Sequence, residues 1–118
     1  MGAATSKVAL GIAGLGGGSR HIMSSFHDNP EVEFAAAANI DHELLDSFQE
    51  ATGARTYDDF ETMCKDPAID VVHVATPNWL HTQHTLVALE HGKHVLVEKS
   101  MATNLEDADR IIEAAASA

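Results

Sequence analysis

The chain has 118 residues, enough for one domain with a buried core but too few for two full domains. Its 18 acidic residues against 7 Lys and Arg give a formal net charge of −11, which repels phosphate backbones and anionic lipids, so neither nucleic acid nor a membrane is an expected partner. The single cysteine, Cys64, excludes an intrachain disulfide and favours a reducing, cytoplasmic compartment.

Apolar, β-prone runs alternate along the chain with segments whose apolar residues recur at helical spacing. Residues 1–6 are expected to form a disordered tail, and residues 7–118 a single folded domain. The predicted strands are residues 7–13, 33–40, 55–57, 71–75 and 94–97. The predicted helices start near Ser19 and then cover residues 42–52, 59–65, 80–91 and, from a Thr103-x-x-Glu106 capping box, the residues through 116.

This alternation predicts an α/β fold, a doubly wound parallel sheet of the Rossmann type with helices on both faces. The strands are nearly continuous runs of Val, Ile and Ala, as expected for strands that are buried on both sides. The sequence stops at the last predicted helix, where such a sheet usually has one more strand. We therefore expect a truncated domain or a fragment.

A glycine-rich turn joins the first predicted strand to the first predicted helix. Gly14 would permit a tight turn, and Gly16 would permit the close approach of a pyrophosphate to the helix N-terminus. Ser19 takes the third position of a G-x-G-x-x-G motif, while Gly17 and Gly18 add flexibility that a ligand would fix. In this context the motif predicts a dinucleotide site, the alternative being a glycine-rich turn without a ligand.

The end of the second strand, about 20 residues further on, should carry the group that contacts the adenosine ribose. Asn39 can hydrogen-bond a ribose hydroxyl, but it repels a 2′-phosphate less than a carboxylate would. Asp41 either restores some preference for NAD or caps the following helix, and both readings stay open. Arg20 is the nearest cation and would favour NADP. The expected cofactor is NAD or NADP, with a slight preference for NAD.

The last predicted strand is followed by Glu98 and Lys99. Hydride transfer from an alcohol carbon needs a group that removes the hydroxyl proton, or returns it in the reverse direction. An amine held at the end of a strand can do either. Lys99 is therefore the catalytic candidate, and the alternative is a solvated lysine paired with Glu98.

Several motifs occur in the order found in the Gfo/Idh/MocA family of NAD(P)-dependent oxidoreductases, which the chain resembles over residues 7–116. The resemblance implies an N-terminal Rossmann domain whose full-length relatives bind substrate with a second α/β domain, absent here, and commonly form homo-oligomers through that domain. The motifs are Gly14-Leu15-Gly16, Asp70-Val71-Val72 leading into Ala75-Thr76-Pro77-Asn78, then His81, and Gly92-Lys93-His94-Val95-Leu96-Val97-Glu98-Lys99.

The resemblance also implies roles for single residues. It places Glu98 by the nicotinamide ribose and makes Lys99 the group that acts on the substrate hydroxyl or carbonyl. His81 either shapes the nicotinamide pocket or is an ordinary polar residue at a helix N-terminus. The loop expected beside the cofactor consists of Ala75, Thr76, Pro77 and Asn78.

One position departs from the family pattern. Relatives usually have a proline after the lysine, commonly joined by a cis peptide, whereas this chain has Ser100. A cis bond before a non-proline residue costs about 2.5 to 4 kcal/mol, so a trans Lys99–Ser100 peptide and a displaced amine are expected. This departure weighs against full catalytic competence.

Other chemistry-bearing residues are assigned structural roles. His81 and His84 lack the cysteine cluster or HExxH spacing of a metal site, so no metal is expected. Cys64 has no paired base in the sequence and is expected to be an unreactive thiol. Trp79 is interpreted as a hydrophobic anchor for the helix that follows it, in preference to a cofactor or dimer contact.

The predicted function is the NAD(P)-binding part of an oxidoreductase that transfers a hydride between nicotinamide and the CH–OH group of a sugar, an inositol or an aromatic diol of the dihydroxyphthalate type. The 118 residues alone are expected to bind cofactor without turnover. The alternative is a non-catalytic module that binds a dinucleotide or senses redox state.

Overall fold

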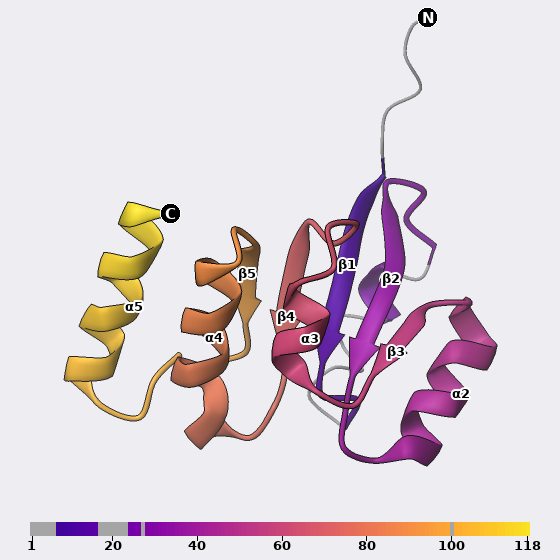
Figure 1. Ribbon diagram of the computed structural model, residues 1–118, viewed down its shortest axis with the longest axis horizontal. Coiled ribbons are helices and arrows are strands. Elements are labelled where there is room, and N and C mark those ends of the chain that lie inside the picture. Colours follow the sequence, from indigo (N-terminus) through magenta and orange to yellow (C-terminus); the bar gives the residue numbers. More distant parts are fainter. Residues whose placement is uncertain (1–6, 17–23, 27, 100) are drawn as a thin grey trace, which may run out of the picture.

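Five strands form one parallel sheet in the computed structural model, which describes residues 7–16, 24–26, 28–99 and 101–118. Within these residues the strand order is β3-β2-β1-β4-β5, so the chain winds outward from β1 in both directions (Figure 1). Every pairing between neighbours is parallel, which confirms the predicted doubly wound fold. The strands are β1 (Val8–Ala13), β2 (Val32–Ala38), β3 (Arg55–Tyr57), β4 (Val71–Val74) and β5 (His94–Val97).

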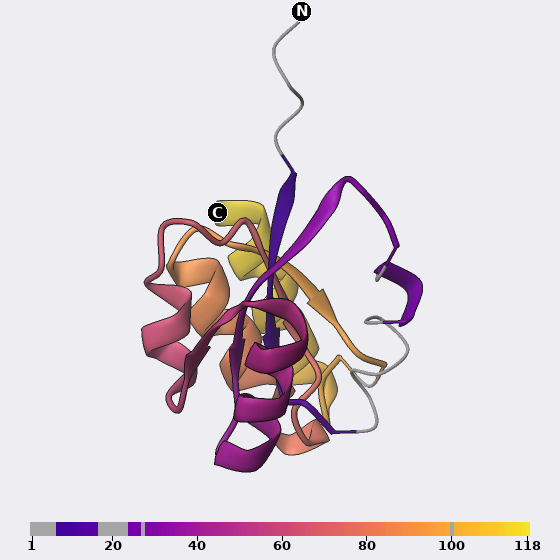
Figure 2. The same cartoon turned by 90° about the vertical axis from the view of Figure 1, so that its right-hand side faces the viewer.

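Helices cover both faces of the sheet. α2 packs on one face and α3 and α4 on the other, while α5 lies beside α4. Figure 2 shows α3 and α4 on the side opposite residues 24–26, which are also helical. The helices are α2 (His42–Thr52), α3 (Phe60–Cys64), the 3₁₀ turn η1 (Asn78–Leu80), α4 (His81–Glu90) and α5 (Leu105–Ser117).

Each face of the sheet has its own hydrophobic core, because side chains alternate between the faces along a strand. Ile12 of β1 belongs to a cluster with Phe48 of α2, and Val72 of β4 belongs to a second cluster with Met63 of α3. Cys64 is buried in the second core, where burial raises the pKa of its thiol to about 12. It is thus an un-ionised packing group, as the sequence suggests.

At two of the boundaries that differ from the predicted ones, a side chain caps the backbone. β2 ends at Ala38, before residue 40, since the Asn39 Oδ1 accepts the Ile40 backbone N–H at 2.7 Å and turns the chain. α5 is capped by Asn104, whose Oδ1 accepts the Asp107 N–H at 2.8 Å. The capping box predicted at Thr103 is therefore wrong by one residue. The expected tail at residues 1–6 and the expected helix start near Ser19 lie outside the described residues.

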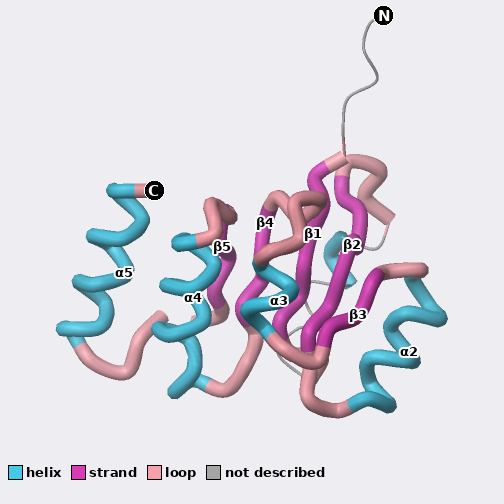
Figure 3. The backbone as a smooth tube through the Cα atoms, viewed as in Figure 1, coloured by secondary structure: helices cyan, strands magenta, loops and turns pink. Residues whose placement is uncertain are grey.

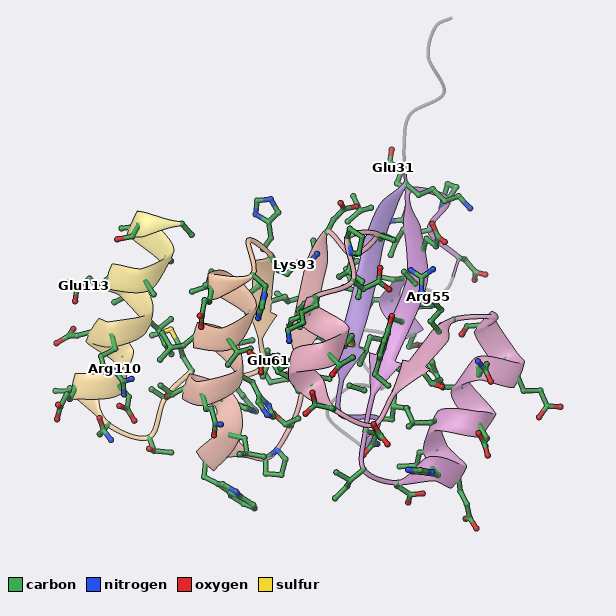
Figure 4. The ribbon with its side chains drawn as sticks, viewed as in Figure 1. Glu31, Arg55, Glu61, Lys93, Arg110 and Glu113 are labelled. Atoms are coloured by element: carbon green, nitrogen blue, oxygen red, sulfur yellow. The ribbon has the colours of Figure 1, made fainter. Side chains whose placement is uncertain are left out.

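Lys93, labelled in Figure 4, connects β5 to the loop between α3 and β4. Its ammonium donates to the carbonyl oxygens of Asp66 and Ile69, both at 2.7 Å. The same loop is held from the β3 side, where the Tyr57 hydroxyl donates to the Asp66 carboxylate at 2.7 Å. These bonds fix the position of β4 against β5.

We predict that Lys93→Met lowers the free energy of unfolding by about 2 to 3 kcal/mol, because two carbonyls lose a charged donor. Urea unfolding followed by circular dichroism measures this change. Lys65→Met, at an exposed position on the same side of the fold, is the matched control and should change stability by less than about 0.5 kcal/mol. Equal effects of the two substitutions would show that Lys93 does not connect these elements.

Candidate functional site

The loops that follow the strands gather at one edge of the sheet, because parallel strands all end on the same side. Figure 3 shows the loops after β2, β3, β4 and β5 at this edge. They surround an open cleft of about 870 Å³. The cleft lies where the strand order reverses, which is the place where open α/β sheets bind ligands. Among its lining residues are Gly14, Gly16, Asn39, Ala75, Thr76, Pro77, Asn78, His81, Glu98 and Lys99.

The turn after β1 is in close contact with the loop after β4. Gly14 has a φ of +89°, and a Cβ at this position would lie 2.7 Å from the carbonyl oxygen of Ala75, so only glycine fits. Gly16 is different, since among the described residues no atom beyond its chain neighbours lies within 4 Å of the place where its Cβ would be. The turn therefore leaves open space above Gly16. Gly17, Gly18 and Ser19 lie outside the described residues.

The polar residues after β2 are engaged with the backbone. The Asn39 Oδ1 accepts the N–H groups of Ile40 and Asp41, and the Asp41 Oδ1 accepts those of Glu43 and Leu44 at 3.0 and 3.3 Å. Asp41 is thus the N-cap of α2, the second of the two readings left open by the sequence. Asn39 is among the described residues that line the cleft, and the contact of Asp41 with a cofactor stays a prediction.

Two histidines of α4 hold the loop after β4. The buried His81 donates its Nε2–H to the carbonyl oxygen of Thr76 at 2.6 Å, which fixes the tautomer because a carbonyl only accepts. The Nδ1 of His84 lies 2.9 Å from the Thr76 hydroxyl, and its ring stacks on Phe60 with 4.2 Å between the centroids. Burial, and then the nearby His81, lower the pKa of His84 and keep it neutral.

His84 and Phe60 line the cleft although the sequence analysis did not assign them to it. The signal for His84 was available, since a residue three positions after His81 lies on the same side of a helix. Phe60 comes from α3, and nothing in the local sequence links it to α4. Its place depends on the packing of the two helices.

The end of β5 brings Glu98 and Lys99 into the cleft. The Glu98 backbone N–H donates to Val74 at 3.0 Å and continues the pairing of β4 with β5. Its carboxylate lies 2.8 Å from the Nε2 of His73, and Lys99 is exposed. Among the described residues no ion pair joins Lys99 to Glu98, and the role of Lys99 stays a prediction. The Lys99–Ser100 peptide includes a residue outside the described ones.

Apolar side chains are exposed on the lining of the cleft. Trp79 is 74% exposed and Ile40 is 89% exposed. Because Trp79 is largely exposed, it is not packed in the core as a hydrophobic anchor for α4 would be. An aromatic ring in such a position offers a surface for a planar ligand.

In the part of the chain that the structure describes, no three His, Cys, Asp or Glu side chains are close enough together to hold a metal ion. None of the helices found in those same ranges combines the length and the apolar character needed to cross a membrane.

Comparisons with known proteins agree with this geometry. A 1-carboxy-3-chloro-3,4-dihydroxycyclohexa-1,5-diene dehydrogenase from Comamonas testosteroni is 38% identical over 103 residues, which are 86% of this chain and 26% of that protein. A D-xylose 1-dehydrogenase (NADP(+)) from Hypocrea jecorina is 35% identical, over 75% of this chain and 23% of its own length. The chain thus spans about a quarter of these curated relatives.

A solved structure gives the same result for the fold. The WlbA dehydrogenase from Bordetella pertussis, in complex with NADH and UDP-GlcNAcA, matches with a TM-score of 0.87 at 28% identity, over 94% of this chain and 34% of that one. Residues 8–118 match the model of an oxidoreductase family with an NAD-binding Rossmann fold. The chain therefore belongs to the Gfo/Idh/MocA family of oxidoreductases.

Proposed function

We propose that this chain is the cofactor-binding part of an oxidoreductase that transfers a hydride between nicotinamide and the CH–OH group of a sugar, an inositol or an aromatic diol. The observation that carries the proposal is the convergence of the loops after β1, β2, β4 and β5 on one cleft at the reversal of strand order. The names of the Comamonas and Hypocrea relatives describe a ring diol and a pentose as their substrates, which supports this substrate class.

The described part of the turn after β1 fits a dinucleotide. A pyrophosphate needs backbone N–H groups without side chains in front of them, and the space above Gly16 meets that need. When bound, the nicotinamide supplies the hydride acceptor or donor. The chain itself would hold the nicotinamide ribose through Glu98. The part of the dinucleotide between this ribose and the pyrophosphate would lie along the loop of residues 75–78.

Lys99 is proposed to handle the substrate proton. Its side chain is exposed in the cleft, so its ammonium is accessible to a hydroxyl or carbonyl that approaches from the open side. As a neutral amine it would accept the hydroxyl proton in oxidation, and as an ammonium it would return that proton in reduction. The substrate itself would be held mostly by residues outside these 118, since the relatives are about four times as long.

We further propose that the cleft accepts both NAD and NADP. The slight preference for NAD expected from the sequence depends on Asp41, whose carboxylate caps α2. The acceptor oxygen of Asn39 is also engaged with the backbone, which leaves its amide N–H₂ as the group for a ribose substituent. A donor suits a hydroxyl and a phosphate alike.

Ser100 favours a second candidate, a module that binds the dinucleotide without catalysis, because relatives usually have a proline there. Lys99→Met separates the two candidates when these residues are joined to a substrate-binding portion. For an enzyme we expect turnover to fall about 10²- to 10⁴-fold with NADH affinity retained. No turnover of the unsubstituted protein with any sugar, inositol or aromatic diol would favour the module, whereas turnover that does not change in Lys99→Met would contradict the role of Lys99.

Gly16→Val tests the phosphate turn. We expect at least about a tenfold loss of NADH affinity, because the added side chain enters the space of the phosphates, with little change in stability since that space is open. Calorimetric titration measures the affinity. Ala115→Val, exposed on α5 far from the cleft, is the control. Retained NADH binding in Gly16→Val contradicts the proposed phosphate site.

Asn39→Asp tests cofactor choice. A carboxylate at this position repels a 2′-phosphate, so the ratio of NADH to NADPH affinity should rise about tenfold or more. Asp41→Ala is the matched control, in which the loss of the N-cap lowers stability by about 1 kcal/mol while the ratio stays the same. A change of the ratio of NADH to NADPH affinity in Asp41→Ala, with none in Asn39→Asp, would indicate that Asp41 contacts the adenosine ribose in place of Asn39.

A further inference from the structure

A fully buried histidine, His73, lies behind the cleft in the middle of β4. Its register partner in β5 is Leu96, and side chains alternate between faces, so Glu98, two residues further on, lies on the same face as His73. The imidazole of His73 therefore contacts the carboxylate of Glu98, with 2.8 Å between the His73 Nε2 and the Glu98 Oε1. A carboxylate only accepts, so Nε2–H is the donor.

The second ring nitrogen of His73, Nδ1, indicates that the hydrogen bond to Glu98 is the main polar interaction of this side chain. Nδ1 is buried and, within the described residues, has no hydrogen-bond partner. The neighbours of His73 in β4, Val72 and Val74, are fully buried and apolar. An aliphatic residue would suit such a strand, since an unsatisfied polar atom in a core is destabilising. Of the two nitrogens, only the one facing Glu98 has a described partner.

His73 acts on the side chain of Glu98 and not on its backbone. The backbone is placed independently, because the Glu98 N–H donates to the carbonyl of Val74. The side chain of Glu98 is 31% exposed and lines the cleft, so without a partner the carboxylate could occupy several rotamers. The hydrogen bond from the buried imidazole restricts them.

We propose that His73 is a positioning residue, which holds Oε1 of Glu98 so that Oε2 is offered to the hydroxyls of the nicotinamide ribose. The inference rests on the proposed function, since it requires a dinucleotide in the cleft. The proposed effect of His73 is confined to one half of that ligand. His73 affects binding of the nicotinamide half, whereas the adenosine half is bound by other loops.

The test compares two ligands on the 118-residue chain, NADH and ADP, by calorimetric titration. In His73→Leu we expect NADH affinity to fall about five- to tenfold and ADP affinity to stay within about twofold, because ADP lacks the nicotinamide ribose. His73→Gln, whose amide N–H₂ replaces the Nε2–H, should recover most of the loss. A purely structural role would weaken both ligands together.

A double-mutant cycle tests the coupling to the carboxylate. His73→Leu combined with Glu98→Ala should lose no more NADH affinity than Glu98→Ala alone, since Glu98→Ala already removes the carboxylate that His73 holds. Additive losses, equal losses for NADH and ADP, or no loss in His73→Leu would each overturn the inference while leaving the proposed function in place. Failure of the unsubstituted chain to bind either ligand would overturn both.

Nuclear magnetic resonance of the unsubstituted chain gives a measurement that needs neither ligand nor variant. Two-bond ¹H–¹⁵N correlations of the histidine rings should show His73 as the Nε2–H tautomer, with its proton shifted by the carboxylate. A protonated Nδ1 with a bare Nε2 would contradict the hydrogen bond to Glu98. This result stands even if His73→Leu does not fold.

Discussion

The close contact between the turn after β1 and the loop after β4 is the constraint on which the rest of the site depends. At the point where the strand order reverses, a glycine without a Cβ allows the backbone at Gly14 to pass against Ala75. Because these two loops touch, Gly16 faces open space and the polar atoms of Thr76 come within reach of α4. Any larger residue at Gly14 would separate the loops and with them the two halves of the cleft.

Imidazole side chains supply much of the rigidity around this cleft in a chain with a formal net charge of −11. His81 and His84 fix the loop after β4, and His73 contacts the one carboxylate at the end of β5. Hydrogen bonds of this kind restrict side chains more strongly in a low-dielectric interior than in water. The exposed charge of Lys99 then remains available for chemistry.

Much of the fold follows from local pattern, and the site follows less completely. Hydrophobic periodicity and glycine stops predict the strands and helices, and the glycine motif with Glu98 and Lys99 predicts which loops form the cleft. Two helix caps depend on single-residue backbone geometry that the local pattern does not specify: Asn104 caps α5 in place of Thr103, and Asp41 caps α2. His73 lies in an apolar run, and its partner is 25 residues away across a strand register that no local signal encodes.

The most direct test of the account is the mapping of NADH onto the chain by backbone amide chemical shifts. The account predicts saturable shifts in the loops at the carboxyl ends of β1, β2, β4 and β5, at Gly14, Gly16, Asn39, Thr76 and Glu98, with the opposite edge of the sheet unchanged. Shifts confined to other surfaces, or no saturable shift with NADH or NADPH, would contradict the assignment of this cleft to a nicotinamide cofactor.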